Sequence, residues 1–183
     1  MIVELRQYTL RPGQRDVLIE LFDGALAEGQ EAVGITLIGW FRDLDDPDQF
    51  VWLRSFRDMQ DRARALAAFY DGPVWAEHRG EANATMIASE NVLLLRPAGN
   101  ASVPSLKNQA EPIVVSIHYF PEPVDDDALE RLERELGPAR AVFVTEESPN
   151  NFPRLPVREG EHVVVRFSSR ADPGAHEVLR LQR

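Results

Sequence analysis

The sequence predicts an α+β protein made of two ferredoxin-like modules, each with the order strand, helix, strand, strand, helix, strand. The first observation is an internal repeat: the strand Val51–Arg54 (VWLR) returns as Val163–Arg166 (VVVR), and the strand around Arg6 returns around His118. Both pairs of strands are 112 positions apart, so their side chains keep the same register. The second observation is that apolar residues alternate with period 2 in some segments and recur at helical spacing in others.

Residues 1–96 contain one full set of these elements. Alternation and turn signals predict the strands, and apolar residues at helical spacing predict the helices. Asp71-Gly72-Pro73 ends the second helix, and we expect a short turn carrying Trp75 and His78 to follow it. The expected elements are a strand over 2–10, a helix over 17–26, strands over 35–41 and 50–56, a helix over 58–70 and a strand over 91–95.

Residues 97–112 are typical of a linker, because they are rich in Pro, Ser, Asn, Gly and Ala and show no periodicity. Residues 113–183 then form a second, degenerate module. An inserted loop over 147–161 is long enough to be a lid or to cover an exposed strand edge, and both alternatives stay open. The expected elements of this module are strands over 113–120, 141–145, 162–168 and 178–181, a helix over 125–136 and a remnant of a helix over 172–176.

Composition removes several classes of function. The formal net charge of −10 argues against a nucleic-acid partner, because phosphate binding needs a basic surface. No apolar stretch is long enough to span a bilayer and no signal region opens the chain, so we expect a cytoplasmic location and no membrane partner. The absence of cysteine excludes disulfides, thiolate metal sites and a thiol nucleophile. The single lysine, Lys107, lies in the linker, where an amine is poorly placed for Schiff-base chemistry.

Several motifs resemble the NIPSNAP domain. They are the run VELRQYTLRPG over 3–13, LIGWF over 37–41, VWL over 51–53, and Asp58 with Arg62. The run NFPRLPVREGE over 151–161 is similar to a segment of two-domain bacterial members of that family. The resemblance implies a dimeric α/β-barrel fold, formed here within one chain, and a relationship in shape to antibiotic-biosynthesis-type monooxygenases. The resemblance is specific for the fold and says little about which reaction, if any, the protein catalyses.

The antiparallel sheet of a ferredoxin-like module carries helices on one face and leaves the other bare. We therefore expect the two bare faces to meet and enclose a shared pocket, with the aliphatic residues of each strand turned toward the helices. Strand parity directs polar side chains into that pocket. They are Glu4, Arg6, Tyr8, Trp52 and Arg54 from the first module and Ser116, His118 and Arg166 from the second.

Arginines dominate the residues expected in the pocket. One interpretation is that Arg6, Arg54 and Arg166 and the carboxylate of Glu4 neutralise one another, because buried charges are unfavourable unless paired. The other is that the excess of arginine holds an acidic small molecule through bidentate hydrogen bonds, with Tyr8 and Trp52 in contact with it as substrate-binding residues.

Two further residues are candidates for roles in this pocket. His118 is the candidate catalytic acid or base, because imidazole changes charge near neutral pH, and the alternative is a structural histidine. Arg154, in the inserted loop, is expected to reach the anionic end of a ligand. Metal binding has little support, since His118, His162 and Glu4 do not have the spacing of any short metal motif.

The sequence thus favours a protein that binds a small anionic or aromatic metabolite in the barrel. Such a protein could act as a cofactor-independent oxygenase, isomerase or lyase, since arginines would stabilise an enolate that His118 generates. The alternative is a noncatalytic interaction or stress-associated protein with a filled barrel. We expect a small-molecule partner and no cofactor, and a homodimer stays an open alternative for the assembly.

Overall fold

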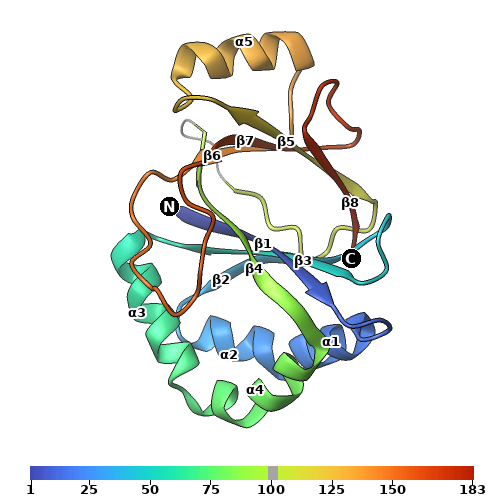
Figure 1. Cartoon of the computed structure of the whole chain (residues 1–183), viewed down its shortest axis with the longest axis vertical. Helices are drawn as coiled ribbons and strands as arrows, with labels where there is room; N and C mark the ends of the chain where they lie inside the picture. Colours follow the sequence, from blue (N-terminus) through green and yellow to red (C-terminus); the bar gives the residue numbers. More distant parts are fainter. Residues whose placement is uncertain (99–102) are drawn as a thin grey trace.

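Eight antiparallel strands close into one barrel in the computed structural model, which describes residues 1–98 and 103–183 (Figure 1). The first half supplies β1 (Ile2–Leu10), β2 (Thr36–Asp43), β3 (Gln49–Phe56) and β4 (Met86–Pro97), and the second half supplies β5 (Ile113–Phe120), β6 (Ala141–Thr145), β7 (His162–Ser168) and β8 (Glu177–Gln182). The order around the barrel is β1-β3-β2-β8-β5-β7-β6-β4, so β1 and β3 lie across it from β5 and β7. The predicted pair of ferredoxin-like modules within one barrel is confirmed.

The strand pairing confirms the internal repeat at the level of single residues. Glu4 of β1 lies opposite Arg54 of β3, and Ser116 of β5 lies opposite Arg166 of β7. These partners are the positions that the 112-residue offset equates. Each half therefore carries an arginine at the same place in its sheet, whereas the glutamate of the first half has a serine as its counterpart.

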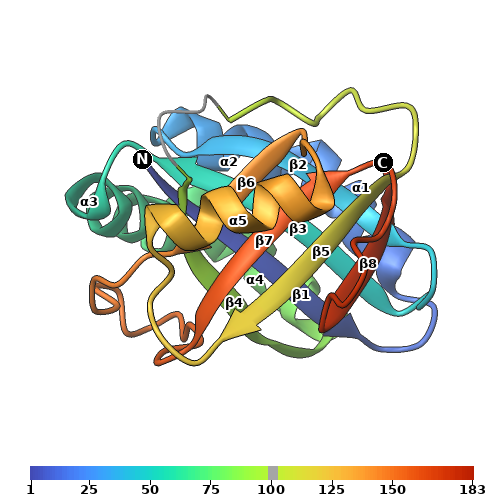
Figure 2. The same cartoon turned by 90° about the horizontal axis from the view of Figure 1, so that it is seen from above.

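The two halves differ in the helices that cover them. The first half has α1 (Arg15–Leu21), the π-helical turn η1 (Phe22–Leu26), α2 (Ala27–Ala32), α3 (Met59–Tyr70) and α4 (Pro73–Thr85), which all lie on the outer face of its sheet. The described part of the second half has one helix, α5 (Asp126–Leu136), which lies over β5, β6 and β7 (Figure 2). Because α5 contains no fully buried residue, it covers its sheet loosely.

The expected turn after the second helix is wrong, because Trp75 and His78 lie on α4. Gly72 is the N-cap of this helix and Pro73 is its first residue. Proline is well suited to that position, since it has no N–H to leave unpaired and its φ angle is already helical. The Gly-Pro pair therefore ends one helix and begins the next.

The expected direction of the strand faces is also wrong. The barrel interior is apolar: Val3, Leu5, Val51 and Leu53 of the first half pack there against aliphatic residues of the second half, among them Val165. Strand alternation then turns the polar residues of both halves outward, toward the helices. The physical reason is that the interior is walled by sheet alone and offers few polar partners, whereas helices and loops on the outer faces can supply them.

The segment before β5 packs on the barrel. The expected linker includes residues 99–102, which lie outside the described residues. Leu106 is buried among the interior residues, and its backbone N–H donates to the carbonyl oxygen of Ile38 at 2.7 Å. This part of the segment therefore contributes to the core.

The shared interior predicts that both halves unfold together. We expect Leu53→Ala in the first half and Leu181→Ala in the second to lower the free energy of unfolding by roughly 2–5 kcal/mol each, because both side chains are fully buried in the barrel. Urea denaturation followed by circular dichroism should show one transition for each variant. Leu44→Ala, at a half-exposed position, is the control and should change the free energy by less than about 0.5 kcal/mol. Two separate transitions would contradict a common core.

Candidate functional site

Four charged side chains meet between the first half's sheet and its helices, and we call them the arginine cluster: Glu4, Arg6, Arg54 and Arg62. Glu4 is fully buried and accepts three hydrogen bonds of 2.7 Å. Arg6 Nη1 and Arg54 Nε donate to Glu4 Oε2, and Arg62 Nε donates to Glu4 Oε1. Strand alternation brings the first three residues to one face of the sheet, and α3 brings Arg62 over them.

The arginine cluster holds more positive than negative charge. Burial by itself raises the pKa of Glu4, but the guanidinium groups of Arg54, Arg6 and Arg62 outweigh it and hold this pKa well below the ordinary value of 4.5. Three cations therefore face one carboxylate. Within the described residues, Arg54 Nη2 and Arg62 Nη2 are buried without a hydrogen-bond partner. An unpartnered buried donor is unfavourable by about 1–3 kcal/mol, so both nitrogen atoms are suited to donate to a ligand.

A narrow aromatic pocket adjoins the arginine cluster. Tyr8 Oη accepts a hydrogen bond from Arg6 Nε, and Gln30 Oε1 of α2 accepts one from Arg54 Nη1, each at 2.9 Å. Tyr8 and Gln30 line a cavity of about 30 Å³, which is small beside the roughly 150 Å³ of an apolar cavity that binds benzene. The other lining residues are Leu18, Phe22, Leu26, Phe50, Trp52, Phe69, Tyr70, Trp75 and Met86. The pocket therefore has an apolar wall and a charged end.

The inserted loop of the second half, residues 147–161, lies across the edge of this site, and we call it the strap. Asn150 Oδ1 and Asn151 Oδ1 both accept hydrogen bonds from Arg62 Nη1, at 3.0 and 2.9 Å. Phe152 is buried beside Tyr70, with ring centroids 6.1 Å apart. The site of the first half is therefore closed by residues from the second half.

The structure brings together four of the predicted site residues and separates the other three. Arg6, Tyr8, Trp52 and Arg54 lie together, although on the helix side of the sheet and not in the barrel. Arg154 of the strap lies at the surface, where its Nη1 is 2.6 Å from Asp71 Oδ1. His118 and Arg166 lie in the other half.

Sequence reasoning missed Arg62 and Gln30 as members of the site. A signal for Arg62 was present in its helical spacing, because Arg62 shares the buried face of α3 with Ala65, Leu66 and Phe69. An arginine on the apolar stripe of a helix needs a buried acidic partner, and Glu4 is that partner.

His118 and Arg166 form a second cluster on the outer face of the second half. His118 Nε2 lies 3.3 Å from Asp172 Oδ2, and Arg166 Nε lies 3.0 Å from the same oxygen. The backbone N–H of Asp172 donates to Ser116 Oγ at 2.9 Å. Because Ser116 stands at the position equivalent to Glu4, a carboxylate from a loop replaces the missing strand carboxylate. His118 is thus across the barrel from Tyr8 and Arg54 and does not share a pocket with them.

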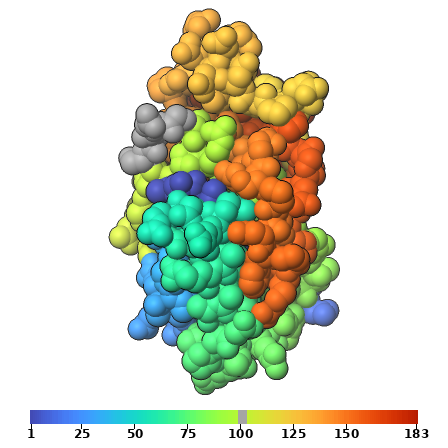
Figure 3. Space-filling view, turned by 90° about the vertical axis from the view of Figure 1, so that its left-hand side faces the viewer, coloured from blue at the N-terminus to red at the C-terminus, as the bar shows by residue number. Residues whose placement is uncertain are grey.

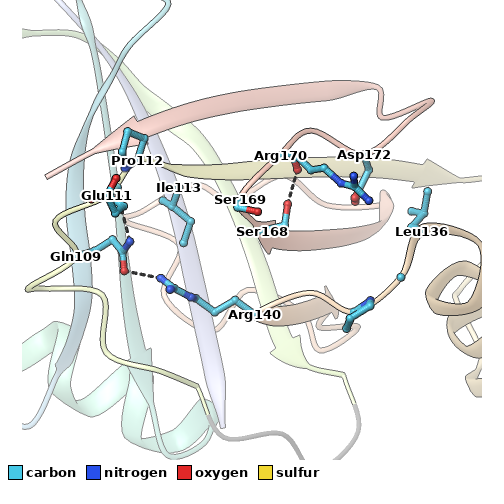
Figure 4. Close-up of a pocket in the computed structure, with 12 residues that line it drawn as sticks. Gln109, Glu111, Pro112, Ile113, Leu136, Arg140, Ser168, Ser169, Arg170 and Asp172 are labelled. Atoms are coloured by element: carbon cyan, nitrogen blue, oxygen red, sulfur yellow. Dashed lines mark hydrogen bonds between the residues drawn. The ribbon is translucent and has the colours of Figure 1, made fainter.

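A cleft of about 680 Å³ lies beside this second cluster, at the end of α5 (Figure 4). Asp172 and Leu136 line it, and Arg140 Nη1 donates to Gln109 Oε1 along one side. The remaining lining residues are Glu111, Pro112, Ile113, Gly137, Pro138, Ser168, Ser169 and Arg170. Its two acidic and two basic side chains balance, so the cleft favours neither an anion nor a cation.

Residues 1–98 and 103–183 contain no group of three or more His, Cys, Asp or Glu residues that could hold a metal ion. The three residues weighed as a metal set do not meet: Glu4 lies in the first half, whereas His118 and His162 lie on the second half. Each histidine has an acidic neighbour of its own, and His162 Nδ1 lies 3.1 Å from Glu147 Oε1. Among the helices of the described residues, none has the length and apolar character needed to cross a membrane.

The chain has the dimeric α/β-barrel fold, in which two ferredoxin-like units close one barrel. Here both units belong to a single chain, and a charged site lies between the sheet and the helices of the first. The chain belongs to the NIPSNAP family, since the sequence model of that family, described as NIPSNAP, matches residues 3–101, more than half of the chain. The predicted resemblance is thereby confirmed. A comparison with curated proteins found no match.

Several solved structures have the same fold. An uncharacterized NIPSNAP-like domain protein from Burkholderia xenovorans is 30% identical, with a TM-score of 0.51, and the match covers 59% of this chain and 95% of that chain. A protein from Agrobacterium tumefaciens is 23% identical, with a TM-score of 0.52, over 56% of this chain and 99% of that chain. A protein from Lactobacillus acidophilus, named as a proposed monooxygenase, is 14% identical, with a TM-score of 0.58, over 100% of this chain and 93% of that chain. The last of these shows the fold across both halves.

The arginine cluster predicts a specific loss of stability in acid. The pKa of Glu4 in the folded protein lies below 4.5, so its ionised form stabilises the fold above pH 4.5, and this contribution is lost as the pH falls below that value. We expect Glu4→Gln to lower the free energy of unfolding at pH 7 by roughly 3–5 kcal/mol, because three buried cations lose their anion. The variant should also lose less stability than the wild type between pH 4.5 and pH 3. Urea titrations at several pH values measure both effects, and Glu20→Gln, at an exposed position, is the control.

Proposed function

We propose that the first half binds a small aromatic molecule that carries a carboxylate, in the pocket between its sheet and its helices. The single observation that carries this proposal is the excess of buried guanidinium groups over carboxylates in the arginine cluster, where two guanidinium nitrogen atoms have no partner among the described residues. A ligand anion would reduce that excess and accept hydrogen bonds from both nitrogen atoms. Arginine suits a carboxylate because its planar fork donates two parallel hydrogen bonds.

The aromatic wall supports the other part of the ligand. Trp52 lies edge-to-face against Tyr8, with ring centroids 5.8 Å apart, and Arg54 Cζ lies 4.9 Å from the Trp52 ring centroid. A flat ring placed between such side chains gains both apolar burial and favourable ring-to-ring geometry. In this proposal Arg54 and Arg62 donate to the anion and Arg6 adds positive charge beside it. Tyr8 and Trp52 contact the ring.

Binding is favoured over the reaction that the sequence suggested. An enolate mechanism needs a base within hydrogen-bond reach of the ligand, and His118 lies across the barrel from the arginine cluster, paired with Asp172. Tyr8 lines the pocket, and burial raises its pKa, so it is neutral at physiological pH. The described pocket thus supplies anchoring groups without a proton acceptor of suitable pKa.

A noncatalytic protein with a filled core is the second candidate function. The small volume of the pocket, about 30 Å³, favours it, because a benzene ring does not fit that space without movement of the wall. In this case the arginine cluster would serve to join the sheet, α3 and the strap. A metabolite would then have no effect on stability.

Ligand binding can be tested with benzoate and with its neutral analogue benzamide. We expect benzoate to raise the melting temperature through mass action and benzamide to have little effect, because the excess positive charge favours the anion. Arg54→Met should weaken benzoate binding by about 10- to 100-fold, the equivalent of losing a hydrogen bond to a charged group worth about 1.5–3 kcal/mol. Isothermal titration calorimetry measures the change.

Arg166→Met is the matched control, since Arg166 stands at the equivalent position of the second half and lies across the barrel from the pocket. Its affinity for benzoate should equal that of the wild type. Equal loss in both variants, or no response of the wild type to benzoate, would contradict the proposal and favour the filled core.

A further inference from the structure

The strap offers a neutral substitute for a carboxylate at Arg62. Two oxygen atoms from neighbouring residues, Asn150 Oδ1 and Asn151 Oδ1, converge on one nitrogen atom, Arg62 Nη1. Two oxygen atoms side by side are what a carboxylate presents to a guanidinium fork. Here both come from uncharged amides, and the adjacent Arg62 Nη2 is buried without a partner among the described residues.

We infer that Arg62 binds the carboxylate of the ligand, and that the amide oxygens of Asn150 and Asn151 occupy the position of that carboxylate in the ligand-free protein. This inference rests on the proposed function, because it assigns the anionic end of the same pocket. A carboxylate adds ionic attraction to the guanidinium and can accept two parallel hydrogen bonds from its fork, which the neutral amides cannot match, so it displaces the amides. It also reaches Nη2, which the amides leave unpaired.

Displacement of the two amides moves the strap away from Arg62, and this movement also enlarges the aromatic pocket. Phe152 follows the two asparagines directly and packs beside Tyr70, which lines the pocket. Withdrawal of residues 150–152 therefore frees the charged end and uncovers the aromatic wall in one step. This explains how a site with about 30 Å³ of free space can admit a benzoate-sized molecule.

The other contacts of the strap allow such movement. Figure 3 shows the strap, in orange, lying along α3 at the surface of the molecule. Asn151 Nδ2 donates to the carbonyl oxygen of Met59, and Arg154 pairs with Asp71 in an exposed ion pair. Exposed ion pairs contribute little to stability. The strap is held to β4 by an isolated β-bridge between Arg158 and Leu93. Residues 150–152 lie before that bridge and belong to no helix or strand, so their withdrawal leaves it in place.

Replacing the two asparagines tests the inference. We expect Asn150→Ala/Asn151→Ala to bind benzoate about tenfold more tightly than the wild type by calorimetry, because the competing amide oxygens are gone. Arg154→Ala is the matched control: it loosens the strap at its surface ion pair, leaves both asparagines in place, and should keep wild-type affinity. If the wild type binds benzoate but the double variant binds it no more tightly, the placeholder role is wrong while the proposed function stands. Equal tightening by Arg154→Ala would also overturn it.

A second measurement uses the unaltered protein, so it does not depend on the folding of a variant. Saturating benzoate should speed trypsin cleavage after Arg154 several-fold, because the strap leaves Arg62, whereas benzamide should leave the rate unchanged. Cleavage that stays equal or slows on benzoate binding overturns the inference. Absence of any benzoate binding, in the wild type and the double variant alike, overturns the proposed function together with it.

Discussion

The packing of two aliphatic sheet faces against each other determines where the polar side chains of both halves lie. Residues such as Leu5, Leu53 and Val165 are fully buried inside the barrel, and their burial is the main favourable term that holds the halves together. Once these faces are used, strand alternation leaves the polar positions on the outside of the barrel. The two halves then have separate outer surfaces and do not share an interior pocket.

The buried arginine of each half has a different acidic partner. In the first half, Glu4 on the neighbouring strand meets Arg54, and α3 adds Arg62 to the same carboxylate. In the second half, serine stands at the glutamate position, and Asp172 from a loop pairs with Arg166. The first arrangement concentrates positive charge between the sheet, α2, α3 and the strap, whereas the second pairs its charges beside an open cleft. The first half is therefore the better site for an anion.

Much of the fold could be predicted from the sequence, because the repeat, the alternation and the helical spacing are local signals. The sequence does not show which face of each sheet packs against the other half. Alternation shows that Glu4, Arg6 and Arg54 share a face, but which face is covered by the other half depends on packing between distant strands. The helix at Trp75 was missed because Gly72-Pro73 can end a helix or begin one. Arg62 was missed because its partner is 58 positions away in sequence.

The most direct test of this account is a crystal structure of the protein with 4-bromobenzoate, in which anomalous scattering locates the bromine. We expect bromine between the sheet and the helices of the first half, beside Tyr70 and Trp52, with the carboxylate on Arg62 and the strap withdrawn. Bromine inside the barrel among Leu5, Leu53 and Val165, or in the cleft beside Asp172, would contradict it.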